Sequence, residues 1–162
     1  MKKIGVIEIL KLVVSVLICQ FAGVIGSFFT TPSIPTWYAT LNKPFFTPPS
    51  WLFAPIWITL YTLMGISAFL VWRKGMSHRN VRTASIVFAV QLILNVLWSA
   101  VFFGLRSLLG GLIAIVILWI AILFTILNFH KISRTAELLL IPYILWVSIA
   151  AALNFSVLIL NP

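Results

Sequence analysis

The sequence WYATLNKPFFTPPSW, residues 37–51, separates two long hydrophobic segments and therefore predicts a loop. The stretch holds five aromatic residues, and Lys43 is its only ionisable side chain. Pro44, Pro48 and Pro49 fix their φ angles and lack a backbone N–H, so one regular helix is not expected through the stretch. A stiff aromatic loop gains little from exposure to water. We expect it to fold down as a lid over an apolar part of the protein.

On both sides of this loop the composition is that of a membrane protein. Of the 162 residues, 62% are hydrophobic and 8% are charged, which is far from the balance of a soluble domain. Five apolar stretches approach roughly 20 residues, the length that a helix needs to cross a bilayer. They cover residues 12–29, 51–72, 83–103, 108–129 and 138–160. We predict an all-α membrane protein in which residues 1–162 form one five-helix bundle, with the first stretch retained as a span.

The formal net charge of +9 is distributed unevenly between the two ends of these spans. The N-terminal segment and the connections 73–82 and 130–137 share one side of the membrane, and they carry nine of the 11 Lys and Arg residues. Positive residues favour the cytoplasmic side. We therefore predict a cytoplasmic N-terminus, an outer C-terminus and a lid on the outer face. Orientation and contact with anionic membrane lipid account for the cations, and no nucleic-acid partner is expected.

Uncharged polar residues and tryptophans recur on single faces of three spans. The members of each face are three or four residues apart: Trp57 and Tyr61 in the second span, Gln91, Asn95 and Trp98 in the third, and Trp146, Ala150 and Asn154 in the fifth. An unpaired amide in lipid is costly, so these faces are expected to point into the bundle. The amides either hold the helices together or line a ligand pocket beneath the aromatic loop.

Residues for acid–base or metal chemistry are scarce. The chain has no Asp, and Glu8, Glu137, His78 and His130 lie near the inner membrane edge. Cys19 is the only cysteine, so no intrachain disulfide can form. The sequence offers no Ser–His–acid or Cys–His set and no metal-ligand spacing. We therefore expect no acid–base catalysis, no bound metal and no cofactor.

Four motifs follow one another along the chain: WYATLNKPFFTPP (37–49), WITLYTLMG (57–65), QLILNVLWSAVFFG (91–104) and PYILWVSIAAALN (142–154). Their combination resembles the TspO/MBR family of translocator proteins and tryptophan-rich sensory proteins. The resemblance implies a five-helix bundle, often a homodimer, with a pocket near its outer end that the first loop closes. It implies a porphyrin such as protoporphyrin IX, or another hydrophobic small molecule, as ligand rather than cofactor. Carried over by motif position, the ligand-binding residues are Trp37, Tyr38, Pro48, Trp57, Tyr61, Gln91, Asn95, Trp98, Trp146 and Ala150.

The end of the fifth span departs from the animal members of this family. Those members have a cholesterol-recognition motif there, which needs a Tyr followed by Lys or Arg. This chain reads LNFSVLILNP from residue 153, so Phe155 replaces the Tyr and no cation follows. Such motifs are weak evidence even where they are present. A tetrapyrrole ligand in a bacterial cell membrane is therefore favoured over cholesterol transport.

Four functions fit these observations. The favoured one is a porphyrin-binding protein or sensor with a pocket formed by the second, third and fifth spans under the first loop. The second is light-dependent porphyrin breakdown, in which Trp57 and Trp146 exchange electrons with the excited ligand. The third is a transporter of porphyrin or another lipophilic molecule, and the fourth is a membrane scaffold. Lys43, the one cation of the lid, is expected to meet an anionic group such as a porphyrin propionate.

Overall fold

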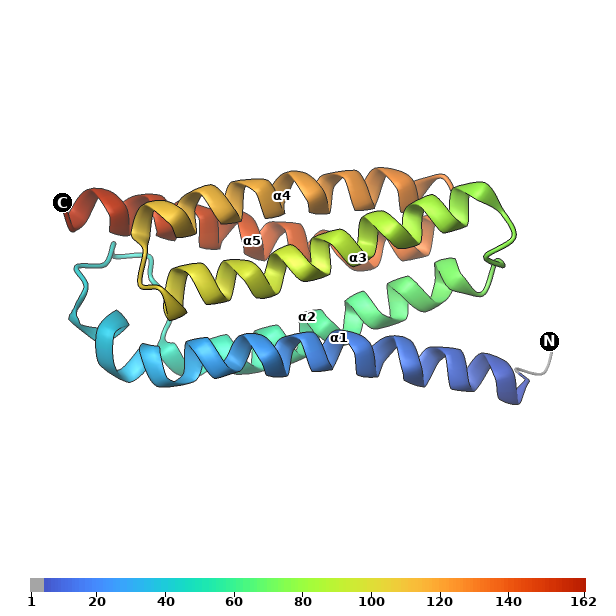
Figure 1. Ribbon diagram of the computed structural model, residues 1–162, viewed down its shortest axis with the longest axis horizontal. Helices are drawn as coiled ribbons and strands as arrows, with labels where there is room; N and C mark the ends of the chain where they lie inside the picture. Colours follow the sequence, from blue (N-terminus) through green and yellow to red (C-terminus); the bar gives the residue numbers. More distant parts are fainter. Residues whose placement is uncertain (1–4) are drawn as a thin grey trace.

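The computed structural model describes residues 5–162 and consists of five long helices in one bundle (Figure 1). The helices are α1 (Val6–Ser33), α2 (Ser50–Trp72), α3 (Arg79–Ser99), α4 (Leu108–His130) and α5 (Arg134–Leu160). Two single π-helical turns, η1 (Ile34–Tyr38) and η2 (Ala100–Gly104), extend α1 and α3. All five helices are long and apolar enough to cross a membrane. The prediction of an all-α membrane protein with five spans is confirmed.

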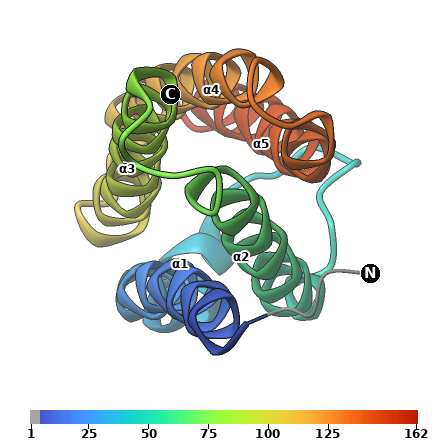
Figure 2. The same ribbon diagram turned by 90° about the vertical axis from the view of Figure 1, so that its right-hand side faces the viewer.

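The helices pack in the order that the end-on view in Figure 2 shows. Helix α4 lies against both α3 and α5, and α2 packs against α5. Helix α1 forms one edge of the bundle, where it contacts α2 and α3. The two ends of the chain lie at opposite ends of the bundle (Figure 1), as an odd number of spans requires.

Several helices extend beyond the apolar stretches of the sequence. Helix α1 begins at Val6 rather than at residue 12, and α5 begins at Arg134 rather than at residue 138. The start of α5 is fixed by Ser133, whose hydroxyl accepts a hydrogen bond from the backbone N–H of Ala136 at 3.3 Å. Such an N-terminal cap depends on backbone geometry and not on hydrophobicity. Hydropathy alone therefore placed these helix ends too far inside the membrane.

The connection between α1 and α2 differs from the expected loop. The chain stays helical through Pro32 and Pro35, so Trp37 and Tyr38 belong to the helical turn η1 and not to a loop. Pro35 stands at the start of η1, where a missing backbone N–H is tolerated, while Pro32 lies within the last turn of α1. The irregular part of the connection covers residues 41–49. It lies at the same end of the bundle as the C-terminus (Figure 1).

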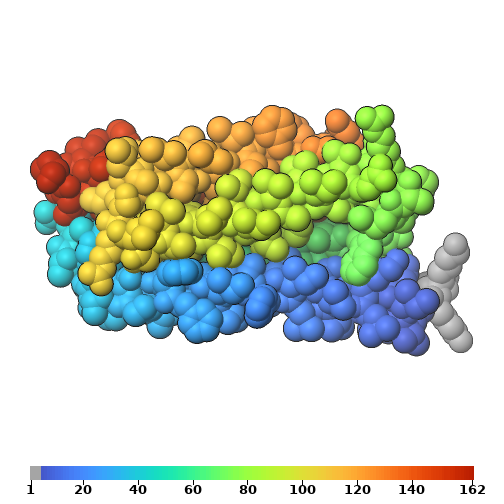
Figure 3. Space-filling view, in the orientation of Figure 1, coloured from blue at the N-terminus to red at the C-terminus, as the bar shows by residue number. Residues whose placement is uncertain are grey.

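The helices pack closely inside the bundle, and the outer surface of the bundle is apolar. A Cβ atom on Gly65 of α2 would lie 2.5 Å from the Cα atom of Val16, so this glycine allows α1 and α2 to approach closely. Large apolar side chains are exposed along α1, among them Phe21 and Phe28. Figure 3 shows α1 and α3 side by side along one face of the molecule. An apolar outer surface is the arrangement expected of helices that face lipid.

Candidate functional site

The two π-helical turns meet at one end of the bundle. The ring of Trp37 lies 5.5 Å from that of Phe102, and the ring of Tyr38 lies 5.7 Å from that of Phe103. The hydroxyl of Ser33 donates a hydrogen bond of 2.9 Å to the carbonyl oxygen of Phe103. These contacts attach the end of α1 to the end of α3. Trp37 and Tyr38 therefore pack against α3 and anchor the first connection.

A cavity of about 480 Å³ opens beside this junction, between α1, α2 and α3. Aromatic side chains line it from α2 and from the end of α3, and small or hydroxyl-bearing residues line it from α1. Val24 of α1 and Ile58 of α2 are exposed at its edge, so the cavity opens between these two helices toward the lipid. The residues that line it include Gly23, Ser27, Thr30, Thr31, Ser50, Trp57, Tyr61, Trp98 and Phe103.

Close approach of α1 shapes the floor of this cavity. A Cβ atom on Gly23 would lie 2.6 Å from the ring of Tyr61, so only a glycine leaves room for that ring. The ring of Trp57 lies 5.5 Å from that of Tyr61 and 6.1 Å from that of Trp98. The three aromatic residues form a continuous apolar surface below the opening. Such a surface suits a flat hydrophobic ligand.

The ten predicted ligand-binding residues fall into three groups in the structure. Trp57, Tyr61 and Trp98 line the cavity. Three predicted residues near the end of α1 and in the first connection do not line it: Trp37, Tyr38 and Pro48. Buried or half-buried residues elsewhere in the bundle do not line it either; these are Gln91, Asn95, Trp146 and Ala150.

No residue of α5 lines this cavity, whereas several residues of α1 do. Aromatic rings fill the space between α2, α3 and α5: Trp57 lies 6.4 Å from Tyr143, and Phe53 lies 6.0 Å from Trp146. Phe53 and Trp57 also line the cavity, so these two rings lie between it and α5. The cavity of about 480 Å³ thus lies between α1, α2 and α3, and a ligand pocket between spans two, three and five stays a prediction.

The buried amides bond to other helices. The Tyr61 hydroxyl donates to Oδ1 of Asn95, and Nδ2 of Asn95 donates to the Tyr143 hydroxyl at 2.8 Å. The Tyr143 hydroxyl donates to Oε1 of Gln91 at 2.9 Å. This tyrosine–amide network, Tyr61–Asn95–Tyr143–Gln91, joins α2, α3 and α5. Of the two interpretations of these amides, the structure shows helix-to-helix hydrogen bonding for Gln91 and Asn95, and their ligand contact stays a prediction.

The ammonium group of Lys43 contacts the protein's own backbone and does not line the cavity. Its ammonium group donates to the carbonyl oxygens of Tyr38 and Leu41 at 2.7 and 2.9 Å and lies 4.9 Å from the centre of the Tyr38 ring. These carbonyls belong to the end of a helical segment, where cations are stabilising. Within residues 5–162, no charged side chain lines the cavity. The lining is thus suited to binding a largely apolar molecule.

The contribution of α1 is the part of the site that the sequence analysis missed. Gly23, Ser27 and Thr30 stand at i, i+4 and i+7 on one helix face and all line the cavity. This spacing of small and hydroxyl-bearing residues was a signal in the sequence. It is also the pattern of simple close helix packing, so only the structure distinguishes the two.

The sequence is similar to known proteins over most of its length. A sequence model of the TspO/MBR family matches residues 15–160. The chain is 45% identical to the tryptophan-rich protein TspO of Chlorobaculum tepidum over 155 residues, which are 96% of this chain and 98% of that protein. It is 48% identical to the tryptophan-rich protein TspO of Archaeoglobus fulgidus over 154 residues, 95% and 99% of the two chains. The translocator protein of Bos taurus is 35% identical over 141 residues, 86% and 83% of the two chains.

Proposed function

Because the chain belongs to the TspO/MBR family, we propose that this integral membrane protein binds a porphyrin or a similarly flat hydrophobic molecule between α1, α2 and α3. The observation that carries the proposal is the cavity of about 480 Å³ with its floor of Trp57, Tyr61 and Trp98. Its volume falls within the range of about 300–1,000 Å³ that is typical of small-molecule sites.

The chemistry of the cavity supports this class of ligand. A macrocycle can stack on the indole rings of Trp57 and Trp98, whose π faces favour offset or edge contacts with other aromatic systems. Hydroxyl groups of the lining, such as those of Ser27 and Thr31 on α1 and of Ser50 on α2, can hydrogen-bond to polar substituents at the edge of the macrocycle. The opening between α1 and α2 lets a hydrophobic ligand enter from the bilayer.

Paired tryptophan variants test the location of the site. Protoporphyrin IX is titrated into the purified protein while tryptophan fluorescence is recorded. Trp57→Ala removes the central ring of the cavity floor and is expected to weaken binding about twofold to tenfold, the range for one aromatic contact. Trp146→Ala is the matched control, because Trp146 is a half-buried tryptophan that does not line this cavity.

The two variants also separate alternative sites. An equal loss of affinity in Trp57→Ala and Trp146→Ala would place the ligand between α2, α3 and α5 instead. Unchanged affinity in both variants would reject the tryptophan-lined site altogether. Wild-type elution in size-exclusion chromatography is required of each variant before its affinity is interpreted.

Light-dependent porphyrin breakdown is the second candidate function. The observation that favours it is the row of tilted rings of Trp57, Tyr61 and Trp98 at the cavity, since electrons pass readily between rings that are 5.5–6.1 Å apart. In this geometry Trp57 and Trp98, and not Trp146, lie beside a bound porphyrin. The same variants, illuminated in air with bound porphyrin, test it. Bleaching at an equal rate in protein-free detergent would exclude this function.

A further inference from the structure

A second cavity, of about 280 Å³, lies nearer the N-terminal end of the bundle. Its lining includes Ser15 and Cys19 of α1, Trp72 of α2, Phe88 and Leu92 of α3, and Phe129 of α4. None of these residues lines the first cavity. We call this space the inner cavity.

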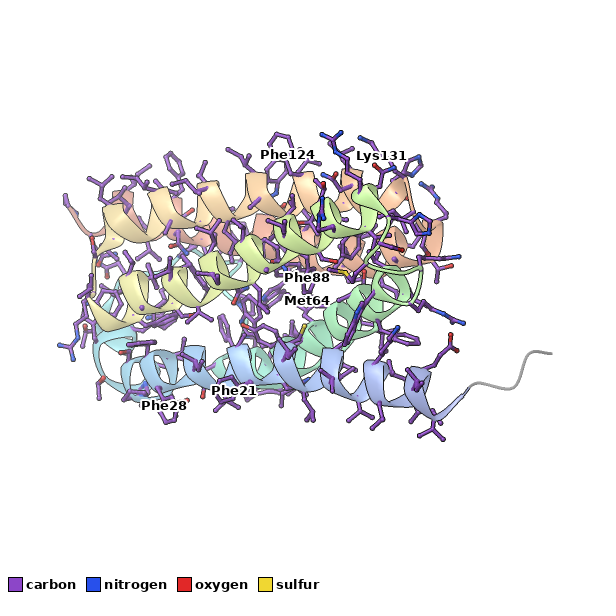
Figure 4. All side chains as sticks on the ribbon, turned by 45° about the vertical axis from the view of Figure 1, so that its right-hand side comes forward. Phe21, Phe28, Met64, Phe88, Phe124 and Lys131 are labelled. Carbon is purple, nitrogen blue, oxygen red and sulfur yellow. The ribbon has the colours of Figure 1, made fainter. Side chains whose placement is uncertain are left out.

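The shape of the inner cavity suits a thin apolar chain. The rings of Phe88 and Phe129 stack at 5.7 Å with an angle of 17° between their planes and form an apolar surface on its α3–α4 side. Ile18 of α1 and Ala89 of α3 are exposed at its edge, so the cavity opens between these helices toward the lipid. Its volume lies just below the roughly 300 Å³ at which small-molecule sites begin. Figure 4 labels Phe88 in the space between α3 and α1.

Two cations stand outside the lining of the inner cavity, toward the membrane edge, on helices that border it. Lys11 lies one helical turn before Ser15, and its ammonium group lies 5.6 Å from the centre of the Trp72 ring. Arg82 precedes Ala89 by seven residues and therefore lies on the same face of α3, toward the membrane edge. Long basic side chains at such positions extend toward the lipid headgroups. Lys11 and Arg82 thus stand on the two helices that border the opening.

Within residues 5–162, the carboxylates of both acidic side chains are paired with other residues than these two cations. Its sequence contains only two acidic residues. Glu8 pairs with Arg73 at 3.2 Å, and Glu137 pairs with Arg134 at 2.7 Å and with His130 at 2.8 Å. Within residues 5–162, neither Lys11 nor Arg82 forms an ion pair. Their charges are complementary to an anion supplied from outside the protein.

We propose that the inner cavity is a binding site for one anionic phospholipid. One acyl chain enters between Ile18 and Ala89 and packs on Phe88, while the phosphate lies between Lys11 and Arg82. Basic residues between helices at the cytoplasmic edge are a known mode of anionic headgroup binding. The site is separate from the proposed porphyrin cavity and does not depend on it.

Fluorescence quenching of Trp72 tests this proposal directly. The full chain is placed in phosphatidylcholine nanodiscs that contain a small fraction of phosphatidylglycerol or phosphatidylcholine with one brominated acyl chain. Bromine quenches only nearby tryptophans, and the signal of Trp72 is the difference between the protein and its Trp72→Phe variant. The expected result is stronger Trp72 quenching by brominated phosphatidylglycerol than by brominated phosphatidylcholine. Equal quenching by the two lipids would overturn the proposal.

Charge variants identify the residues that hold the headgroup. Lys11→Gln and Arg82→Gln are each expected to lower the preference for phosphatidylglycerol about fivefold, the effect of one cation near a membrane surface. Lys131→Gln is the matched control, because Lys131 is an exposed cation of the α4–α5 turn that lies across the bundle from α1 (Figure 4). An equal decrease in Lys131→Gln would mean a general attraction to the membrane edge and would reject the site.

A steric variant separates the chain from the headgroup. Ala89→Leu narrows the opening and leaves both cations in place. It is expected to abolish the extra quenching of Trp72, because the acyl chain can no longer enter. Unchanged quenching in Ala89→Leu would show that the lipid binds by its headgroup alone and would overturn the assignment of the cavity. Ala89 is exposed, so this substitution does not disturb the packed core.

Discussion

At the scale of single residues, Tyr143 shows how polar groups stabilise an otherwise apolar bundle. Its hydroxyl accepts a hydrogen bond from Asn95 and donates one to Gln91, and all three side chains are almost fully buried. Nε2 of Gln91 has no hydrogen-bond partner within residues 5–162. The amide of Gln91 therefore depends on the Tyr143 hydroxyl for its only bond. A buried polar group without a partner costs more than the bond itself contributes.

Replacing Tyr143 with Phe is expected to destabilise the protein. The change removes the bond to Gln91 and leaves Nδ2 of Asn95 without its acceptor, a loss of about 1 kcal/mol for hydrogen bonds between membrane helices. Thermal unfolding in detergent measures the effect. Tyr38→Phe is the matched control, since Tyr38 is also buried but its hydroxyl makes no hydrogen bond within residues 5–162. Equal stability of the two variants would contradict the role of the network.

At the scale of elements, the irregular segment 41–49 is fastened to the far end of the chain. The backbone N–H of Asn42 donates to Oδ1 of Asn161 at 2.9 Å, and Nδ2 of Asn161 donates to the carbonyl oxygen of Asn42 at 2.9 Å. Nδ2 of Asn42 also donates to the carbonyl oxygen of Leu160 at 3.3 Å. These bonds hold the segment over the end of α5. We call these three hydrogen bonds the clasp. The clasp and the hydrogen bonds from Lys43 to backbone carbonyl oxygens determine the position of the segment.

Loss of the Asn161 side chain is expected to loosen this segment without unfolding the bundle. In Asn161→Ala, the backbone amide of Asn42 loses its acceptor and should exchange its hydrogen faster, because local opening then breaks fewer bonds. Hydrogen–deuterium exchange followed by mass spectrometry measures the change over residues 41–49.

Asn128→Ala provides the control for the clasp. Asn128 is also an asparagine near a helix end, but its side chain bonds only within α4, to the carbonyl oxygen of Phe124. Its removal should leave exchange in residues 41–49 unchanged. If Asn161→Ala exchanges at the wild-type rate in this segment, the clasp does not hold it.

At the scale of the whole molecule, the charges divide between the two ends of the bundle. Among residues 5–162, every Lys and Arg except Lys43 and Arg106 lies at the end of the bundle that holds the α2–α3 and α4–α5 turns. Lys2 and Lys3 of the sequence count lie outside the described residues. Such a bias sets the orientation of membrane proteins. We propose that the cationic end, with the N-terminus, faces the cytoplasm.

Reporter fusions test this orientation in bacterial cells. Alkaline phosphatase is active only outside the cytoplasm, so a fusion after Pro162 is expected to be active and a fusion after Gly75 inactive. Gly75 lies in the turn between α2 and α3, at the cationic end. The opposite pattern would mean that the charge bias does not orient this protein. Equal expression of both fusions is the control.

Much of the fold could be predicted because its signals are local. Each span is a run of apolar residues, and the spacing of Gln91, Asn95 and Trp98 follows from the helical repeat alone. The cost of an unpaired amide in lipid then places this face inside the bundle. The end of α1 was harder to predict, since Pro32 and Pro35 argue against helix and the π turn that admits Pro35 is a matter of local backbone geometry.

The sequence by itself determined five membrane helices, their inward faces, the charge bias and the family. Only the tertiary structure decided which spaces between the helices stay open. Helical spacing says which way Trp57 and Trp146 point, but not whether rings from other helices fill the space in front of them. Trp57 and Phe53 pack against Tyr143 and Trp146 of α5, while the cavity lies toward α1, where the ring of Tyr61 packs on Gly23. Empty volume depends on side chains from segments far apart in the chain, so it appears only when the helices are packed.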